Sequence, residues 1–222
     1  MTTGRTPEAP QAQPQPQPRR SHARSNRVRL LAAAREELGR DPDASLDEIA
    51  RAAGVVRRTL YGHFPSREAL IDALATEAEE RLEDAFTAAR RPGAEPPAAL
   101  AGLVLASWEV GDHYRMLISL ARRRLGEERL RAILAPARAE AAAILDRGQQ
   151  DGSFGTHLPA PVLALATESV VLALLESQPS PQLSAQWSDP TGAAAATAVL
   201  VTAGVAPAAA RIYVQAALRT GR

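Results

Sequence analysis

The sequence predicts an all-α protein, and three observations lead to that prediction. Alanine occurs 47 times in the 222 residues and all 26 basic residues are arginine; both residue types favour helices. Aromatic residues make up only 4% of the chain, and β-branched residues, which favour strands, are sparse. Apolar residues also recur at helical spacing in most segments after the N-terminal stretch.

The composition excludes several classes of protein. The chain has no cysteine, which rules out disulfides, thiolate nucleophiles and cysteine-bound metals. It lacks the run of roughly 18 apolar residues that a membrane span needs. Its N-terminus carries proline and glutamine where a signal peptide has an apolar core. We therefore expect a cytoplasmic protein with one medium domain or two small ones.

Charge is distributed unevenly along the chain. The net charge of the whole chain is +1, but residues 1–67 carry +5 and residues 68–222 carry −4. Residues 1–22 are predicted to be a disordered arm, because the Gln-Pro alternation at Gln11–Pro18 has nothing to bury. The arginines in and directly after this arm either contact a DNA backbone or belong to a solvated tail. They are Arg19, Arg20, Arg24, Arg27 and Arg29.

Helices are predicted between residues 23 and 90, each bounded by residues that start or stop helices. Ser45 and Glu48 form a capping box before the second helix, and Ser66 caps the fourth. Gly39 ends the first helix in this prediction, and Arg91-Pro92-Gly93 stops the fourth. The predicted helices are Ala23–Leu38, Leu46–Ala53, Val56–His63 and Arg67–Arg90.

Residues 46–64 have the spacing of a helix-turn-helix motif. Ala50 is small enough to let two short helices cross closely, and Gly54 suits the positive φ of the tight turn. Ile49, Val55 and Leu60 are predicted to form the apolar wedge between the two helices. The second helix keeps a polar, basic outer face that can enter a DNA major groove.

The stretch SLDEIARAAGVVRRTLYGHFPSREALI, residues 45–71, resembles the DNA-binding domain of the TetR family of transcriptional regulators. Its most specific part is TLYGHFPSREAL, and the similarity extends over about residues 27–90. The resemblance implies a three-helix helix-turn-helix DNA-binding domain at residues 23–68. It also implies a helical ligand-binding and dimerisation domain at residues 69–222.

The resemblance further implies which residues of the motif contact DNA. Arg57 and Arg58, at the start of the recognition helix, are the candidates for base edges, because arginine can bridge guanine O6 and N7. The other residues would meet the phosphate backbone. The full predicted set is Ser45, Arg57, Arg58, Thr59, Tyr61, His63 and Arg67.

Two residues depart from the expected pattern. Val56 stands where the family usually has serine or threonine, so the recognition helix lacks a side-chain cap worth about 1 kcal/mol. Gly62 lies inside that helix and loosens it. These departures leave an alternative open, namely a helical dimeric adaptor that kept the fold and lost specific DNA binding.

The C-terminal part is predicted to be helical throughout, over Pro96–Trp108, Asp112–Arg124, Glu127–Gln150, Pro159–Ser177, Gly192–Ala203 and Pro207–Thr220. The helix at 159–177 is more apolar than one buried stripe requires, which favours a subunit interface. A fully buried central helix is the alternative. The residues predicted to contact a second copy are Leu163, Val170, Val171 and Leu174.

A ligand pocket is predicted where the scarce large side chains gather, around the fifth and sixth helices. His113 is the candidate anchor for a polar group of the ligand. For Trp108, Leu117 and Leu120 the alternative is a plain core position, which residues at this spacing more often occupy. The predicted ligand-binding residues are Phe86, Trp108, His113, Tyr114, Met116, Leu117 and Leu120.

Nothing in the sequence predicts an enzyme, a cofactor or a metal site. The chain has four histidines, no HExxH or GxSxG motif and no phosphate-binding glycine loop. We therefore predict a homodimeric regulator, released as a repressor from a pseudo-palindromic operator by a small apolar or aromatic effector. The helix Arg67–Arg90 would carry the change from Phe86 in the pocket to the helix-turn-helix.

Overall fold

The structure, a computed structural model, describes residues 18–177 and 191–220, without the side chains of residues 18–23, 116, 117, 119 and 121. Within these ranges the only regular secondary structure is α-helix, which confirms the predicted fold class. No helix in the described ranges is long and apolar enough to cross a membrane. The helices are α1 (Pro18–Arg40), α2 (Leu46–Ala52), α3 (Arg57–His63), α4 (Arg67–Ala89), α5 (Pro96–His113), α6 (Arg115–Gln150), α7 (Ala160–Glu176), α9 (Gly192–Thr202) and α10 (Pro207–Thr220).

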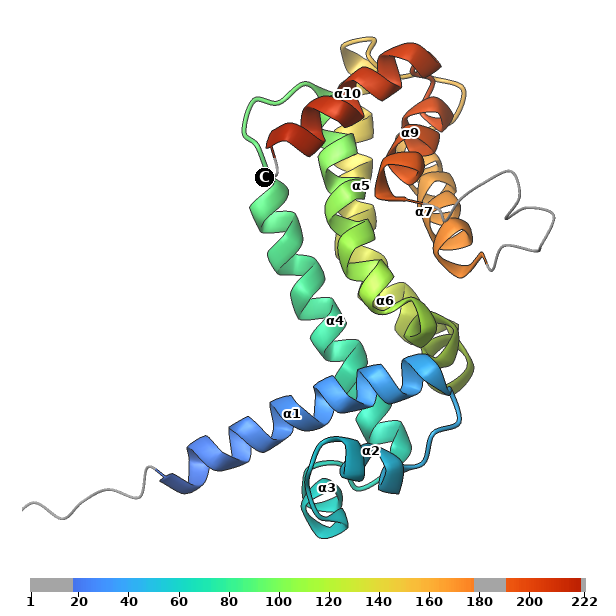
Figure 1. The fold of residues 1–222 in the computed structure, drawn as a ribbon. Helices are drawn as coiled ribbons and strands as arrows, with labels where there is room; N and C mark the ends of the chain where they lie inside the picture. The colour runs from blue at the N-terminus through green and yellow to red at the C-terminus, as the bar shows by residue number, and fades with distance from the viewer. Residues whose placement is uncertain (1–17, 178–190, 221–222) are drawn as a thin grey trace, which may run out of the picture.

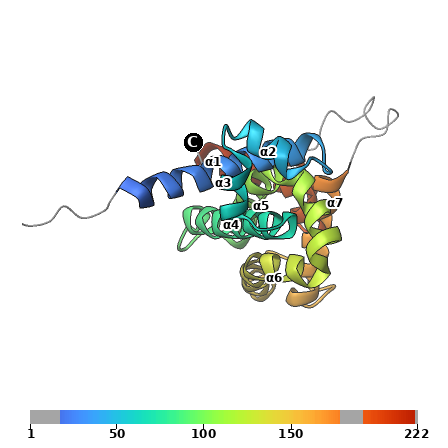
Figure 2. The same cartoon turned by 90° about the horizontal axis from the view of Figure 1, so that it is seen from below.

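Helices α1, α2, α3 and the first half of α4 form a head at one end of the molecule (Figure 1). The head has its own apolar core, in which Ile49 of α2 and Leu60 of α3 are fully buried. The N-terminal half of α1 projects away from the rest of the chain in both views (Figures 1 and 2). The largest core side chains of the head are Leu30, Leu38, Ile49, Leu60, Phe64, Leu70, Ile71 and Leu74.

The remaining helices form a body around α5, which contacts α4, α6, α7, α9 and α10 (Figure 1). Small residues let α5 approach its neighbours closely. A Cβ on Gly111 would lie 2.7 Å from the side chain of Leu175 on α7, and one on Gly192 of α9 would lie 3.0 Å from Trp108. Alanine and glycine in this sequence therefore serve helix packing as well as helix formation.

Most predicted helix ends agree with the structure within one or two residues, and the exceptions have physical causes. Helix α1 begins at Pro18 and continues to Arg40, so residues 18–22 are helical and Gly39 lies inside the last turn. The i→i−4 bonding persists past Gly39, because Asp41 N–H donates to the Glu37 carbonyl. Residues 1–17 of the predicted arm lie outside the described residues.

Two glycines of the body behave differently from each other. The sequence predicts that Gly111 separates two helices, but α5 runs through it to His113, since its role is the close contact with Leu175. Gly126 does interrupt a helix as predicted: its φ of 84° and ψ of 165° divide α6 into two segments. The first segment meets the head, and the second runs through the body.

Candidate DNA-binding head and ligand cavity

The connection between α2 and α3 has the predicted helix-turn-helix geometry. The Ser45 hydroxyl accepts a hydrogen bond from the Glu48 N–H at 3.2 Å, and the Glu48 carboxylate accepts one from the Ser45 N–H at 2.7 Å. This hydrogen bond from the Ser45 backbone lowers the pKa of Glu48. Gly54 adopts a φ of 64° in the turn, a conformation that glycine reaches without strain. The capping box and the turn glycine are thus confirmed.

The outer face of α3 carries the exposed side chains of Arg57, Arg58 and Tyr61. Arg57 donates to the Asp47 carboxylate at 2.8 Å and lies over the Tyr61 ring, 5.2 Å from its centroid. Arg58 is exposed and has no polar partner among the described residues. Thr59 and His63 are half-buried on the same helix. Arg58 is therefore the more available of the two arginines predicted to read bases.

Val56 begins α3 in extended geometry and makes no side-chain capping bond, as its sequence predicts. Its side chain is 69% exposed, so it adds little to the core. The next helix is capped in the ordinary way: the Ser66 hydroxyl accepts from the Ala69 N–H at 3.1 Å. The recognition helix is the less well capped of the two.

Two arginines, Arg29 and Arg67, hold parts of the head together. Arg67 donates to the backbone carbonyls of Ala44 and Pro42, which ties α4 to the loop before α2. Arg29 of α1 donates to the carbonyl of Ala53 at 2.7 Å and to that of Gly54 at 3.2 Å. The Arg67 guanidinium is thus engaged with the chain's own backbone, and its contact with a phosphate stays a prediction. Arg29 thus donates hydrogen bonds to backbone carbonyls at the end of α2, where a helix has no donors of its own.

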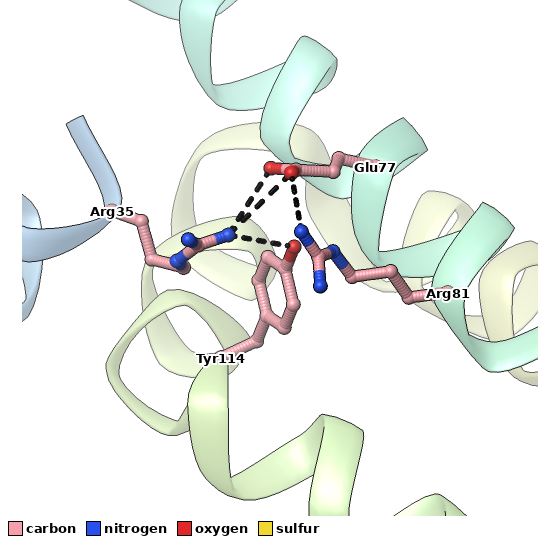
Figure 3. A network of polar contacts seen from close by, with 4 residues as sticks. All are labelled: Arg35, Glu77, Arg81 and Tyr114. Atoms are coloured by element: carbon pink, nitrogen blue, oxygen red, sulfur yellow. Dashed lines mark hydrogen bonds and ion pairs between the residues drawn. The ribbon is translucent and has the colours of Figure 1, made fainter. Parts of the chain in front are cut away.

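Head and body meet at Tyr114, between α5 and α6, whose side chain is 4% exposed. Its hydroxyl accepts a hydrogen bond from Arg35 of α1 at 3.2 Å. Arg35 also pairs with Glu77 of α4 at 3.4 Å, and Arg81 donates to the same carboxylate at 3.1 Å (Figure 3). Burial raises the pKa of Tyr114. One polar network thus joins α1, α4 and the α5–α6 junction.

A cavity of about 140 Å³ lies in the body among α4, α5, α6 and α7. Tyr114 is part of its lining, so the same residue borders the cavity and contacts α1. The apolar lining includes Ile71, Leu74, Leu82, Leu100, Leu103, Val104, Leu130, Ile133, Leu134, Val171, Leu172 and Leu175. The polar lining residues are Ser107, Tyr114, Arg138, Thr167 and Glu168.

The structure brings one predicted ligand-binding residue, Tyr114, to this cavity and places four others elsewhere. Phe86 packs in the body core beside a different hollow, and Trp108 packs against α9. His113 is exposed, with its Nδ1 2.9 Å from the Glu109 carbonyl oxygen, and Leu120 belongs to the core of the head. The side chains of Met116 and Leu117 lie outside the described residues. The prediction groups residues that are close in sequence, although they point from different faces of their helices.

The residues that do line the cavity follow a helical period that the sequence contains. On α5 they include Leu100, Leu103, Val104, Ser107 and Gly111, which form one stripe. The stripe alone could not be assigned to a pocket, because its partners come from three other helices. The tertiary structure alone decides which helices pack beside this stripe.

The structure places the residues of α7 that were predicted to contact a second copy in different environments. Leu163 is fully buried in its own chain, so it offers no surface to a second copy. Val170, Val171 and Leu174 are half-buried, and Val171 lines the cavity. The exposed apolar side chains of α7 are Val162 and Leu165, at 46% and 49%; Val201 of α9 is 40% exposed. The helix is therefore partly core and partly outer surface.

Comparison with known proteins identifies the head. The sequence model described as "Bacterial regulatory proteins, tetR family" matches residues 30–74. The chain is 38% identical over 69 residues to the uncharacterized HTH-type transcriptional regulator TtgW of Pseudomonas putida, covering 30% of this chain and 52% of TtgW. The head therefore matches the DNA-binding region of TetR-family regulators. This confirms the resemblance drawn from residues 45–71.

Solved structures extend the likeness from the head to the whole fold. RolR (NCGL1110), in complex with resorcinol, aligns with a TM-score of 0.51 at 22% identity, covering 88% of this chain and 95% of RolR. The TetR-like regulator LfrR of Mycobacterium smegmatis, in complex with proflavine, aligns with a TM-score of 0.61 at 23% identity, covering 82% and 96%. At this level of identity the likeness establishes the fold. The chain spans about half the length of TtgW in their match.

Proposed function

We propose that this TetR-family protein is a ligand-responsive DNA-binding transcriptional regulator of the cytoplasm, acting as a dimeric repressor. The observation that carries the proposal is the recognition helix α3. It leaves Arg58 and Tyr61 exposed on its outer face, while Leu60 is fully buried on its inner face. A helix of this kind on a rigid support can enter a major groove with its arginines at the base edges.

DNA binding is tested by a selection from random-sequence duplexes, followed by mobility shifts of the selected duplex over a range of salt concentrations. Specific, salt-dependent binding is expected, because phosphate contacts release counterions. Arg57→Ala combined with Tyr61→Phe should abolish the shift. No DNA binding at any salt concentration would refute the regulator and favour the adaptor that lost its DNA site.

We propose that the cavity among α4, α5, α6 and α7 receives the effector. It is a concave space with a mostly apolar lining, the kind that takes small molecules. RolR and LfrR, which share the fold, were solved with the aromatic compounds resorcinol and proflavine. Both ligands support an aromatic effector for this protein. The proposed effector site is this cavity and not the pocket predicted around Trp108 and His113.

The proposed switch acts through the contacts between the cavity and the head. Ile71 and Leu74 of α4 belong to the head core and also line the cavity. Tyr114 lines it too and receives the hydrogen bond from Arg35. An effector that moves these side chains changes how α1 and α4 hold the two recognition helices, and operator affinity falls. In this proposal Ile71, Leu74 and Tyr114, and not Phe86 as predicted from the sequence, link the cavity to the head.

The switch is tested with Tyr114→Phe, which removes the hydroxyl and keeps the ring. We expect the variant to bind its operator and a cavity ligand, while ligand reduces operator affinity by a smaller factor than in the wild type. Tyr213→Phe removes a hydroxyl that donates to Glu95, far from the head, and is the matched control. An unchanged ligand effect in Tyr114→Phe would show that the hydroxyl is not part of the coupling.

A further inference from the structure

The cavity has the size and lining of a site for one small ring. Its volume is about 140 Å³, and an apolar cavity of about 150 Å³ is known to stay dry and hold benzene. Aliphatic side chains from all four helices make up most of the lining, among them Leu74, Leu103, Ile133 and Leu172. Size and lining together favour a ligand of about one substituted benzene ring.

The hydroxyl groups of the lining are already engaged within the protein. The Ser107 hydroxyl donates to the Leu103 carbonyl at 2.7 Å, and the Thr167 hydroxyl donates to the Ala164 carbonyl at 2.9 Å. The Tyr114 hydroxyl points into the network with Arg35, Glu77 and Arg81 (Figure 3). Ser107 and Thr167 keep lone pairs that can accept a hydrogen bond from a ligand, but their protons are used.

The two charged groups of the lining neutralise each other. Arg138 of α6 forms two hydrogen bonds to the Glu168 carboxylate of α7, from Nε at 2.8 Å and from Nη2 at 3.0 Å. Their side chains are 23% and 20% exposed. A carboxylate ligand would have to displace Glu168 from Arg138, and a cationic ligand would have to displace Arg138. Either exchange leaves one protein charge unpaired in a poorly hydrated place, which is costly.

From these contacts we infer that the cavity selects neutral, single-ring aromatic molecules over charged ones, and that a hydroxyl is the polar substituent it accommodates. The Arg138–Glu168 pair excludes anionic and cationic analogues of the same size. This inference rests on the proposed function, since it specifies the effector of the proposed cavity. It concerns ligand charge, so it stands or falls independently of DNA binding.

The inference is tested with four ligands of nearly equal size: toluene, benzyl alcohol, benzoate and benzylammonium. Their affinities for the full chain are measured by isothermal titration calorimetry. Toluene and benzyl alcohol should bind, and the two charged ligands should bind at least about tenfold more weakly than benzyl alcohol. Benzoate or benzylammonium binding as tightly as benzyl alcohol would overturn the inference.

Two charge variants assign the selectivity to the ion pair. Glu168→Gln frees Arg138 and should strengthen benzoate binding at least about tenfold; Arg138→Gln frees Glu168 and should do the same for benzylammonium. Glu140→Gln breaks a different ion pair of α6, with Arg90, and is the matched control. Circular dichroism verifies that each variant folds, and benzyl alcohol verifies that its cavity is intact.

The outcomes separate the inference from the proposed function. If both charge variants keep the wild-type order of affinities, the pair does not set selectivity and the inference fails. If none of the four ligands binds although the chain retains a selected operator, the inference fails together with the proposed cavity, while DNA binding stands. If the chain binds toluene and benzyl alcohol in preference to the two charged ligands but binds no DNA, the regulator fails and the inference is supported.

Discussion

At the scale of single residues, the two adjacent arginines of α3 differ in what they must give up to reach DNA. Arg57 starts from a 2.8 Å contact with Asp47, whereas Arg58 is unengaged among the described residues. We predict that Arg58→Ala weakens operator binding by about 1–3 kcal/mol and relaxes selectivity at one base pair. Competition shifts with operators altered one base at a time measure this. An equal loss of affinity for every operator would instead indicate that Arg58 contacts a phosphate and not a base.

Asp47 provides a second prediction at this scale, because its carboxylate holds Arg57 and lies on the head. Asp47→Asn should strengthen DNA binding, since it frees Arg57 and removes a negative charge near the phosphates. Asp84→Asn, at an exposed position in the C-terminal half of α4, makes the same change in net charge and should leave operator affinity nearly unchanged. Equal effects of the two variants in a titration would contradict a local role for Asp47.

Val56 provides a third prediction, about stability. Its backbone already has the extended geometry of an N-cap, with φ −75° and ψ 149°, but valine offers no acceptor. Val56→Ser should stabilise the protein by about 0.5–2 kcal/mol by capping α3. Chemical denaturation measures the gain, and Val56→Ala, which also lacks an acceptor, should show none. A serine variant no more stable than the alanine variant would disprove capping at this site.

At the scale of elements, the starts of α2 and α4 make the head sensitive to acid. Hydrogen bonds from the Ser45 backbone and from the Glu68 N–H lower the pKa values of Glu48 and Glu68. A carboxyl whose folded pKa is depressed stabilises the fold above its unfolded pKa of about 4.3, and this contribution is lost as pH falls through the folded pKa. We expect Glu48→Gln with Glu68→Gln to flatten the decline of the melting temperature below about pH 5. Glu83→Gln, exposed on α4, should leave the decline as it is.

At the scale of the whole molecule, we predict that a second copy packs on the exposed apolar residues of α7 and α9. Val162, Leu165 and Val201 lie on two helices that contact each other, far along the body from the head. Leu165→Arg should convert a dimer into monomers in analytical ultracentrifugation and weaken operator binding, because two recognition helices about 34 Å apart are needed for a palindrome. Val28→Arg, at a 62% exposed position of α1, should remain dimeric. A dimeric Leu165→Arg variant would place the interface elsewhere.

Much of the head could be predicted from sequence because its determinants are local. The Ser45–Glu48 box, the positive φ of Gly54 and the missing cap at Val56 each depend on residues within a few positions of one another. The cavity could not be predicted in this way, because its lining comes from four helices spread over residues 71–175. Trp108 and His113, predicted to line the ligand pocket, border a different hollow from this cavity.

By itself, the sequence determined the helical fold, the order of the helices and the motif that resembles the TetR family's DNA-binding domain. Helix propensity, capping and turn geometry act over a few residues, so they can be read along the chain. Only the tertiary structure decided that Arg29 and Arg67 bind backbone carbonyls of the head, that Leu163 is buried and that Arg138 pairs with Glu168 across the cavity. These contacts join residues distant in sequence, and their partners are set by how whole helices pack.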